Sequence, residues 1–133
     1  MIPQFNEFGY LPSGIHAASV AEIEQRFGRE SELRRTQMDS VGWLIDLARR
    51  VGVSRLILNG SFVTDIIEPN DVDCVLLIDS GYPKDANAAE ELAEGLPFLD
   101  ISILQRRAFE RLVNEFFATD RYGVPKGVVE VML

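Results

Sequence analysis

The sequence predicts a mixed α/β (α+β) fold, in which a small sheet of about four strands is flanked by helices. The chain has 133 residues, which is the size of one domain. Hydrophobic residues make up 47% of it and charged residues 26%, as in an ordinary globular domain. After a helical start, the segments follow the order strand, strand, helix, strand, helix, strand. We therefore expect a single domain over residues 1–133.

The N-terminal segment, residues 1–15, is rich in turn-forming residues such as Pro3, Asn6 and Gly9. Aromatic residues, including Phe5 and Phe8, are interleaved with them. Because such side chains gain stability from burial, we expect this arm to pack on the domain.

Two helices are expected next. Ser19-Val-Ala-Glu22 has the form of a capping box and begins a short helix that ends near Gly28. A longer helix is predicted over about 30–51, with Gly52 just beyond its end. Its inward stripe comprises Leu33, Gln37, Val41, Leu44 and Ala48, widened by Trp43 and Leu47. Its solvent face is assigned to Arg34, Arg35, Arg49 and Arg50.

The rest of the chain supplies the sheet. Strands are predicted over 55–59, 71–78, 98–104 and 127–133, and helices over 86–96 and 105–118. The second strand is almost wholly apolar, so we expect it near the centre of the sheet. In the last helix the inward residues are expected to be Phe109, Leu112, Val113 and Phe116.

The charge pattern limits the partners. The net charge is −8, and residues 57–100 alone hold ten acids and one base. This excess serves either solubility or a cluster of carboxylates that needs a cation. It disfavours non-specific nucleic-acid binding, which requires clustered Lys and Arg.

The expected location is the cytoplasm. No apolar run approaches the ~20 residues that cross a bilayer, so we expect no membrane association. Residues 1–10 lack the basic and apolar regions of a secretory signal. The single cysteine, Cys74, cannot form an internal disulfide, which fits a reducing compartment. Its position after Asp73 favours a place in the core over a nucleophilic role.

Three acidic side chains and a Gly-Ser pair form the candidate site. Asp71 and Asp73 are two residues apart on a strand, so they project from one face and repel each other. A divalent cation such as Mg²⁺ relieves this repulsion. Asp100 joins them if its strand lies beside theirs. Gly60-Ser61 ends the preceding strand and forms a small anion site if a helix follows it.

This pattern resembles the DNA polymerase β-type nucleotidyltransferase superfamily. Gly60-Ser61, a nine-residue gap, Asp71-x-Asp73 and a later strand acid are most similar to its minimal nucleotidyltransferases, which occur in toxin–antitoxin and defence loci. Further segments resemble an uncharacterised bacterial family of that fold, and this likeness runs nearly end to end. These segments are residues 2–7, 11–16, 59–64, 69–73 and 123–127.

The resemblance implies a role for each matching residue. Asp71, Asp73 and Asp100 would bind Mg²⁺ or Mn²⁺, and Asp100 would also favour deprotonation of the attacking hydroxyl. Gly60 and Ser61 would hold a nucleoside triphosphate. The reaction would transfer a nucleotidyl group, AMP from ATP, with loss of pyrophosphate. Two departures are visible: the gap is one residue shorter than in the commonest minimal form, and Phe62-Val63-Thr64 replaces an arginine-containing stretch.

Several readings stay open at this point. Lys126, in Pro-Lys-Gly, is either a nucleotide-binding residue or a solvated turn lysine. His16 is expected to be a residue of the arm rather than a ligand. The acidity favours a protein acceptor over free RNA, and the small size of the chain predicts that a partner protein supplies the recognition of this acceptor. The alternatives to an enzyme are a non-catalytic antitoxin or partner-binding protein on the same fold, and a nucleotide-binding sensor.

Overall fold

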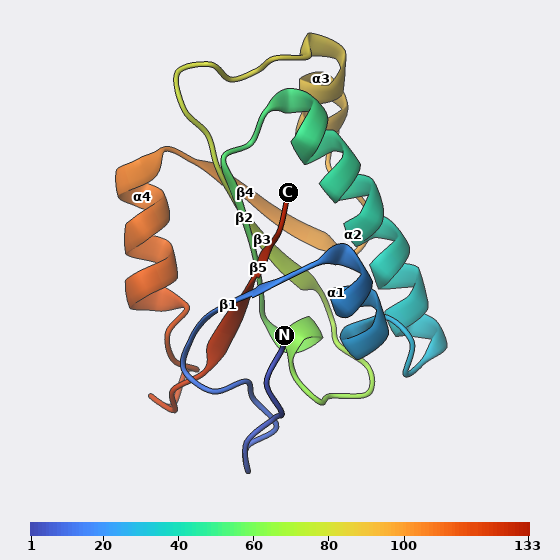
Figure 1. The fold of residues 1–133 in the computed structure, drawn as a ribbon, viewed down its shortest axis with the longest axis vertical. Helices are drawn as coiled ribbons and strands as arrows, with labels where there is room; N and C mark the ends of the chain where they lie inside the picture. The colour runs from blue at the N-terminus through green and yellow to red at the C-terminus, as the bar shows by residue number, and fades with distance from the viewer.

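A five-stranded sheet with helices on both faces forms the protein, as a computed structural model of residues 1–133 shows (Figure 1). Helices α1, α2 and α3 cover one face, and α4 covers the other. The elements are β1 (Gly14–Ala18), α1 (Val20–Phe27), α2 (Glu32–Val51), β2 (Arg55–Asn59), η1 (Ser61–Val63), β3 (Val72–Leu77), α3 (Ala86–Glu94), β4 (Leu99–Leu104), α4 (Arg106–Arg111), η2 (Leu112–Phe116) and β5 (Gly127–Val131). The predicted α+β class is confirmed.

The sheet is mixed, in the order β1-β5-β2-β3-β4. The central strand β2 runs antiparallel to both β3 and β5, while β1 is parallel to β5 and β4 is parallel to β3. The prediction of about four strands missed β1. This short segment, Gly-Ile-His-Ala-Ala, has little apolar alternation, and its only partner lies at the other end of the chain. Nothing local therefore marks it as a strand.

Apolar side chains from both faces of the sheet fill two cores. The larger core lies under α1, α2 and α3, and the arm contributes Ile2 and the fully buried Leu11 to it. The smaller core lies under α4 and includes Ile57, Val75 and Phe109. Since residues alternate along a strand, the two cores contact alternate positions of β2 and β3.

The predicted helix ends are close to those observed. The capping box of α1 is present, with Ser19 accepting from the Glu22 N–H and the Glu22 carboxylate accepting from the Ser19 N–H. Helix α2 begins after Ser31, two residues later than predicted. It ends at Gly52 in a left-handed conformation, with φ of 81°.

Three predicted side-chain orientations were wrong. Arg34, assigned to the solvent face of α2, is only 2% exposed. Trp43, expected in the inward stripe, is 47% exposed, and its Nε1–H donates to the Glu91 carboxylate at 2.8 Å. Phe116, expected inward, is 60% exposed. The cause at Phe116 is the π-helical turn η2, because its wider turn rotates later residues away from the face that α-helical spacing predicts.

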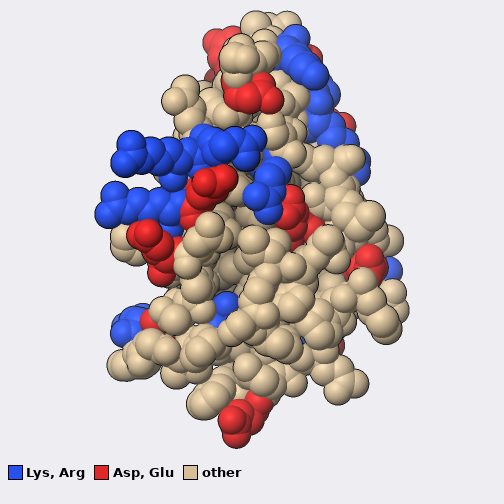
Figure 2. Space-filling model, turned by 60° about the vertical axis from the view of Figure 1, so that its left-hand side comes forward, with Lys and Arg blue, Asp and Glu red and all other residues tan.

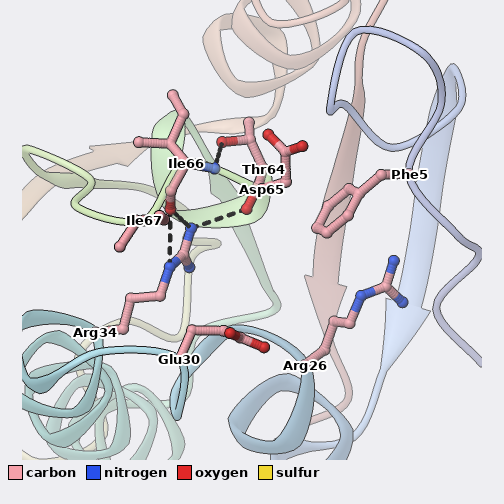
Figure 3. A pocket seen from close by; sticks show the side chains of 8 residues that line it. All are labelled: Phe5, Arg26, Glu30, Arg34, Thr64, Asp65, Ile66 and Ile67. Atoms are coloured by element: carbon pink, nitrogen blue, oxygen red, sulfur yellow. Dashed lines mark hydrogen bonds between the residues drawn. The ribbon is translucent and has the colours of Figure 1, made fainter.

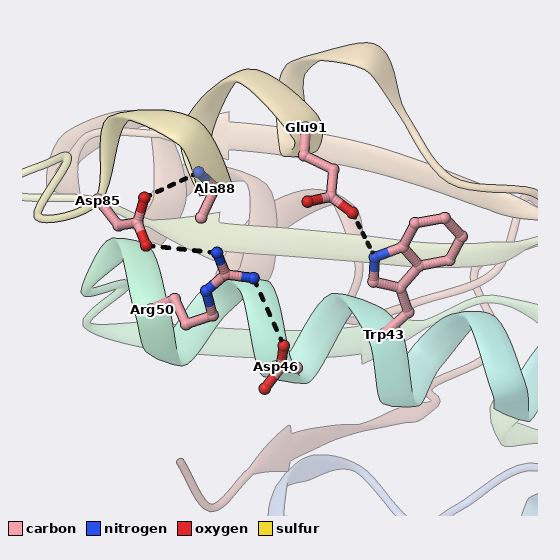
Figure 4. Close-up of polar contacts among 6 residues, drawn as sticks. All are labelled: Trp43, Asp46, Arg50, Asp85, Ala88 and Glu91. Carbon is pink, nitrogen blue, oxygen red and sulfur yellow. Dashed lines mark hydrogen bonds and ion pairs between the residues drawn. The ribbon is translucent and has the colours of Figure 1, made fainter.

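Polar contacts join α3 to α2 on the outer surface of the larger core (Figure 4). Asp85 caps α3 by accepting from the Ala88 N–H, and its other oxygen accepts from Arg50, which also pairs with Asp46. The Trp43 bond to Glu91 lies further along the same pair of helices. No helix of the structure has both the length and the apolar character required to cross a bilayer.

Candidate functional site at one end of the sheet

Two of the three predicted carboxylates lie side by side where β3 and β4 begin. Asp73 of β3 is in register with Asp100 of β4 and, on its other side, with Asn59 of β2. Paired residues of neighbouring strands project from the same face, so these three side chains share the face that α4 covers. Asp71 precedes β3, is exposed and stands outside the ladder. The sheet therefore joins Asp73 and Asp100, with Asp71 close by along the chain.

The absence of a side chain at Gly60 makes room for the Asp73 carboxylate. The glycine's φ of 83° and ψ of −165° belong to a region that essentially only glycine adopts. A Cβ at this residue would lie 2.5 Å from Asp73 Oδ2, which is far inside van der Waals contact. The glycine thus lets the backbone approach the Asp73 carboxylate closely, whereas the Gly-Ser motif predicted a close approach to a bound ligand.

The segment after Gly60 does not form the helix on which the anion-site interpretation depended. Only a single 3₁₀ turn, Ser61–Val63, follows it. The Ser61 carbonyl accepts from the N–H and the hydroxyl of Thr64, which closes the turn. The short turn does not provide the helix N-terminus that the anion-site interpretation required. Any contribution of Ser61 to phosphate binding comes from its own hydroxyl and N–H.

Arg34 of α2 holds the loop that follows this turn (Figure 3). Its guanidinium donates to the carbonyls of Phe62 at 2.7 Å, Thr64 at 2.8 Å and Ile66 at 3.0 Å. A further bond, to the Phe27 carbonyl at 3.0 Å, ties the same group to the end of α1. Burial lowers the pKa of Arg34, but no acid pairs with it within ion-pair distance. The charge is satisfied by backbone carbonyls alone.

The arginines that line the cavity beside Arg34 bind the protein's own backbone. It has a volume of about 260 Å³ and lies between the arm, α1 and this loop, with Phe5 and Arg26 on the far wall. The Arg26 guanidinium lies over the Phe5 ring and donates to the carbonyls of Ile2 and Pro3. Both arginines already bind backbone groups, so the cavity offers few free donors to a ligand.

The electrostatics of the carboxylate pair depend on burial. Asp73 is half-buried, and this burial, followed by the neighbouring charges of Asp100 and Asp71, raises its pKa. The positive charge of Lys126 partly offsets the rise. Lys126 is half-buried just before β5, so it lies close enough to act on Asp73 across the end of the sheet. The structure thus places this lysine near the predicted site.

The oxygen donors of this arrangement are two carboxylates in register and one neighbouring amide. No set of three or more His, Cys, Asp or Glu side chains is gathered in a way that could hold a metal ion. Mg²⁺, however, is usually bound through one or two carboxylates plus substrate phosphates. Asp73 and Asp100 meet that requirement, and the buried Asn59 Oδ1, which has no hydrogen-bond partner, adds a neutral oxygen in the same row. Asp71, two residues before Asp73 in the chain, is the third of the predicted carboxylates.

Sequence reasoning missed both Arg34 and Asn59. The signal for Asn59 was a polar residue at the end of the otherwise apolar run Leu56-Ile57-Leu58. The signal for Arg34 was weaker, since a buried loop with irregular backbone needs donors for its carbonyls from elsewhere. Neither the spacing nor the charge of Arg34 distinguishes it from its neighbour Arg35.

The remaining candidate residues have structural surroundings. His16 lies in β1, and its Nε2 is 2.6 Å from the carbonyl oxygen of Pro12 in the arm. Cys74 is buried on the opposite face from Asp73, and burial raises the pKa of its thiol. Basic side chains on the α4 face stand among acidic ones (Figure 2), as in the Arg106–Glu110 and Arg111–Glu115 pairs. This face therefore offers no continuous basic surface.

Fold and site together define an α+β domain with a carboxylate pair, a close-approach glycine and a lysine at one end of a mixed sheet. The chain belongs to a family of unknown function, DUF6932, whose model matches residues 3–132. No curated protein and no solved structure matches the sequence.

Proposed function

We propose that this protein is a minimal nucleotidyltransferase. It transfers a nucleotidyl group, AMP from ATP, with Mg²⁺ or Mn²⁺ to a macromolecular acceptor in the cytoplasm. The acceptor is a protein, and a partner protein helps to recognise it, in a toxin–antitoxin or defence context. The observation that carries the proposal is the register of Asp73 with Asp100, together with the approach of Gly60 to the Asp73 carboxylate.

Each residue has a task that its position supports. Asp73 and Asp100, with Asp71 nearby, would hold the metal ion, which neutralises phosphate charge when bound. Gly60 lets the backbone lie against the Asp73 carboxylate, and Ser61 offers a hydroxyl and an N–H. Lys126 adds a positive charge next to Asp73.

The transfer step forms one bond, breaks one bond and moves one proton to Asp100. An acceptor hydroxyl oxygen forms a bond to the α-phosphorus, and the bond from the α-phosphorus to the bridging oxygen breaks. Pyrophosphate leaves, and the hydroxyl proton passes to the Asp100 carboxylate. Asp100 suits this task because it is exposed and can meet a large acceptor. A general base of this kind contributes about 10²–10⁴-fold to the rate.

Incubation with α-labelled nucleoside triphosphates and Mg²⁺, with and without the product of the neighbouring gene, tests the proposal. We expect label on protein, and we expect Asp100→Asn to reduce transfer by about 10²-fold or more while nucleotide affinity changes only a few-fold. Asp79→Asn is the matched control, since Asp79 follows the opposite end of β3. Absence of transfer by the wild-type protein with its partner, or unchanged transfer by Asp100→Asn, would refute the mechanism.

Metal binding provides a separate test. Calorimetry should detect Mn²⁺ binding that strengthens when a nucleoside triphosphate is present. The double variant Asp71→Asn/Asp73→Asn should lose this binding, because it removes two of the three oxygen anions. Equal Mn²⁺ affinity in this variant would remove both residues from the site.

A non-catalytic partner-binding protein, such as an antitoxin, is the second candidate. Three observations favour it: Asp71 lies outside the ladder, no three acidic side chains gather to hold a metal, and the segment Phe62-Val63-Thr64 brings no arginine towards the phosphates. A sensor that binds nucleotide without transfer is the third. Nucleotide binding without transfer, in the presence of the partner, would select the sensor, and no nucleotide binding would select the partner-binding protein.

A further inference from the structure

One row of side chains crosses all five strands at the end of the sheet that carries the carboxylates. Ile15 of β1 is in register with Val128 of β5, and Asn59, Asp73 and Asp100 follow on β2, β3 and β4. The link between the two groups comes from the antiparallel register of β2 with β5, in which Leu58 lies opposite Val129. One residue further, Asn59 therefore lies opposite Val128. The row changes from apolar to amide to carboxylate in the order of the strands.

The row lies on the face that α4 and η2 cover. Val128 shares the smaller core with Phe109 and Val113. Asn59 and Asp73 are each two residues from a member of that core, Ile57 and Val75, so they project from the same face. A ligand bound along the row would therefore lie between the sheet and the end of η2.

Asn59 is the feature of the row that the fold alone leaves unexplained. It is 2% exposed, yet its Oδ1 has no hydrogen-bond partner. Buried polar groups nearly always have one, because an unpaired buried group costs free energy. Since Asn59 lies directly beside Asp73, a ligand at the carboxylates is the nearest source of the missing partner.

A cavity of about 150 Å³ lies at the apolar end of the row. Its walls include Ile15 and Val128, with Val113, Phe117 and Ala118 opposite, and Lys126 on its border. Sites for drug-sized ligands run to about 300–1,000 Å³, so this cavity holds one ring system and not a whole nucleotide. Lys126 lies on the side of this cavity where β5 begins, at the end of the sheet that carries the carboxylates.

We propose that this row is a nucleotide-binding site in which the base occupies the cavity between β1, β5 and η2. The phosphates lie over Asp73 and Asp100, and the Asn59 Oδ1 accepts a hydrogen bond from a sugar hydroxyl between them. Three strand spacings of about 4.8 Å separate the cavity from the carboxylate pair, which is about 14 Å, the scale of an extended nucleotide. This inference rests on the proposed function and adds to it the position of the base and the role of Asn59.

Calorimetry with two probes tests the inference: ATP with Mn²⁺, and inorganic tripolyphosphate with Mn²⁺. Tripolyphosphate supplies the phosphates without a base or sugar. We expect the wild-type protein to bind ATP at least tenfold more tightly than tripolyphosphate. Ala118→Phe, which fills the cavity, should abolish this preference and leave tripolyphosphate affinity within a few-fold.

Asn59→Leu gives the second readout. This variant should lower the affinity for ATP at least tenfold. It should not lower Tm, because it replaces an unpaired buried amide by an apolar group of similar size. A residue with a purely structural role would change Tm instead. Ser40→Ala is the matched control: it removes a buried hydroxyl from α2, on the other side of the sheet, and should leave ATP affinity unchanged.

The outcomes separate the two proposals. Equal affinity of the wild-type protein for ATP and tripolyphosphate would overturn this inference and leave the proposed function standing. If the protein binds neither ATP nor tripolyphosphate, the proposed function is overturned and this inference with it. If Asn59→Leu fails to fold, the Ala118→Phe comparison decides, and retention of the ATP preference in that variant would refute the placement of the base.

Discussion

Replacement of Arg34 by methionine is expected to destabilise the protein severely. Methionine retains much of the apolar stem but has no donor for the carbonyls that Arg34 binds. Those carbonyls belong to Phe27 and to Phe62, Thr64 and Ile66 in the loop after η1. The side chain is 2% exposed, so water does not reach the guanidinium and cannot substitute for it without rearrangement.

The size of the effect follows from these bonds. A hydrogen bond that involves a charged group contributes about 1.5–3 kcal/mol, and the contributions in one network are not additive. The loop is partly exposed and can recover some bonds to water, so two of the bonds set the expected loss, about 3–6 kcal/mol. Total stabilities of domains are about 5–15 kcal/mol, so the variant should be close to unfolding. Arg34→Lys should recover little, since an ammonium lacks the planar fork of donors.

Urea unfolding monitored by circular dichroism measures the loss. The neighbouring arginine provides the control: Arg35 is exposed and makes one bond, to the Arg29 carbonyl at 3.2 Å. Arg35→Met should change the free energy of unfolding by no more than about 0.5 kcal/mol. If Arg34→Met and Arg35→Met agree within about 1 kcal/mol, the loop does not depend on Arg34 and the reasoning is wrong.

Three further outcomes are expected. Asp85→Ala should lower Tm at neutral pH, while Asp85→Asn, which still caps α3, should lower it less. Because the cap and Arg50 hold the pKa of Asp85 below its ordinary value, the charged form of Asp85 stabilises the fold above about pH 4. The Tm difference between the wild type and Asp85→Ala should therefore shrink as the pH falls through the lowered pKa of the folded state. A constant Tm difference down to about pH 2 would contradict this. Cys74, buried and with a raised pKa, should react with a thiol reagent only in denaturant, and complete labelling of the native protein within minutes would disprove its burial. At about 0.15 M salt, micromolar protein should not shift random DNA or single-stranded RNA in a gel, and tight, salt-sensitive binding would point instead to a nucleic-acid acceptor.

Local signals were sufficient for most of the elements. The capping box at Ser19, the glycine after α2 and the apolar run that became β3 each lie within a few residues of the structure they specify. These features depend on backbone geometry and side-chain periodicity, so the sequence by itself was enough to predict them and the α+β class.

The tertiary structure decided the features that depend on distant partners. The strand β1 exists because β5, from the other end of the chain, supplies its hydrogen bonds. Arg34 is buried because an irregular loop 28 to 32 residues later in the sequence presents carbonyls to it, and the sequence does not distinguish Arg34 from Arg35. Asn59 became a candidate only when the sheet register placed it between an apolar cavity and Asp73. Contacts between residues far apart in the chain leave no periodic trace in the sequence, which is why the carboxylates could be proposed from it and the rest of their surroundings could not.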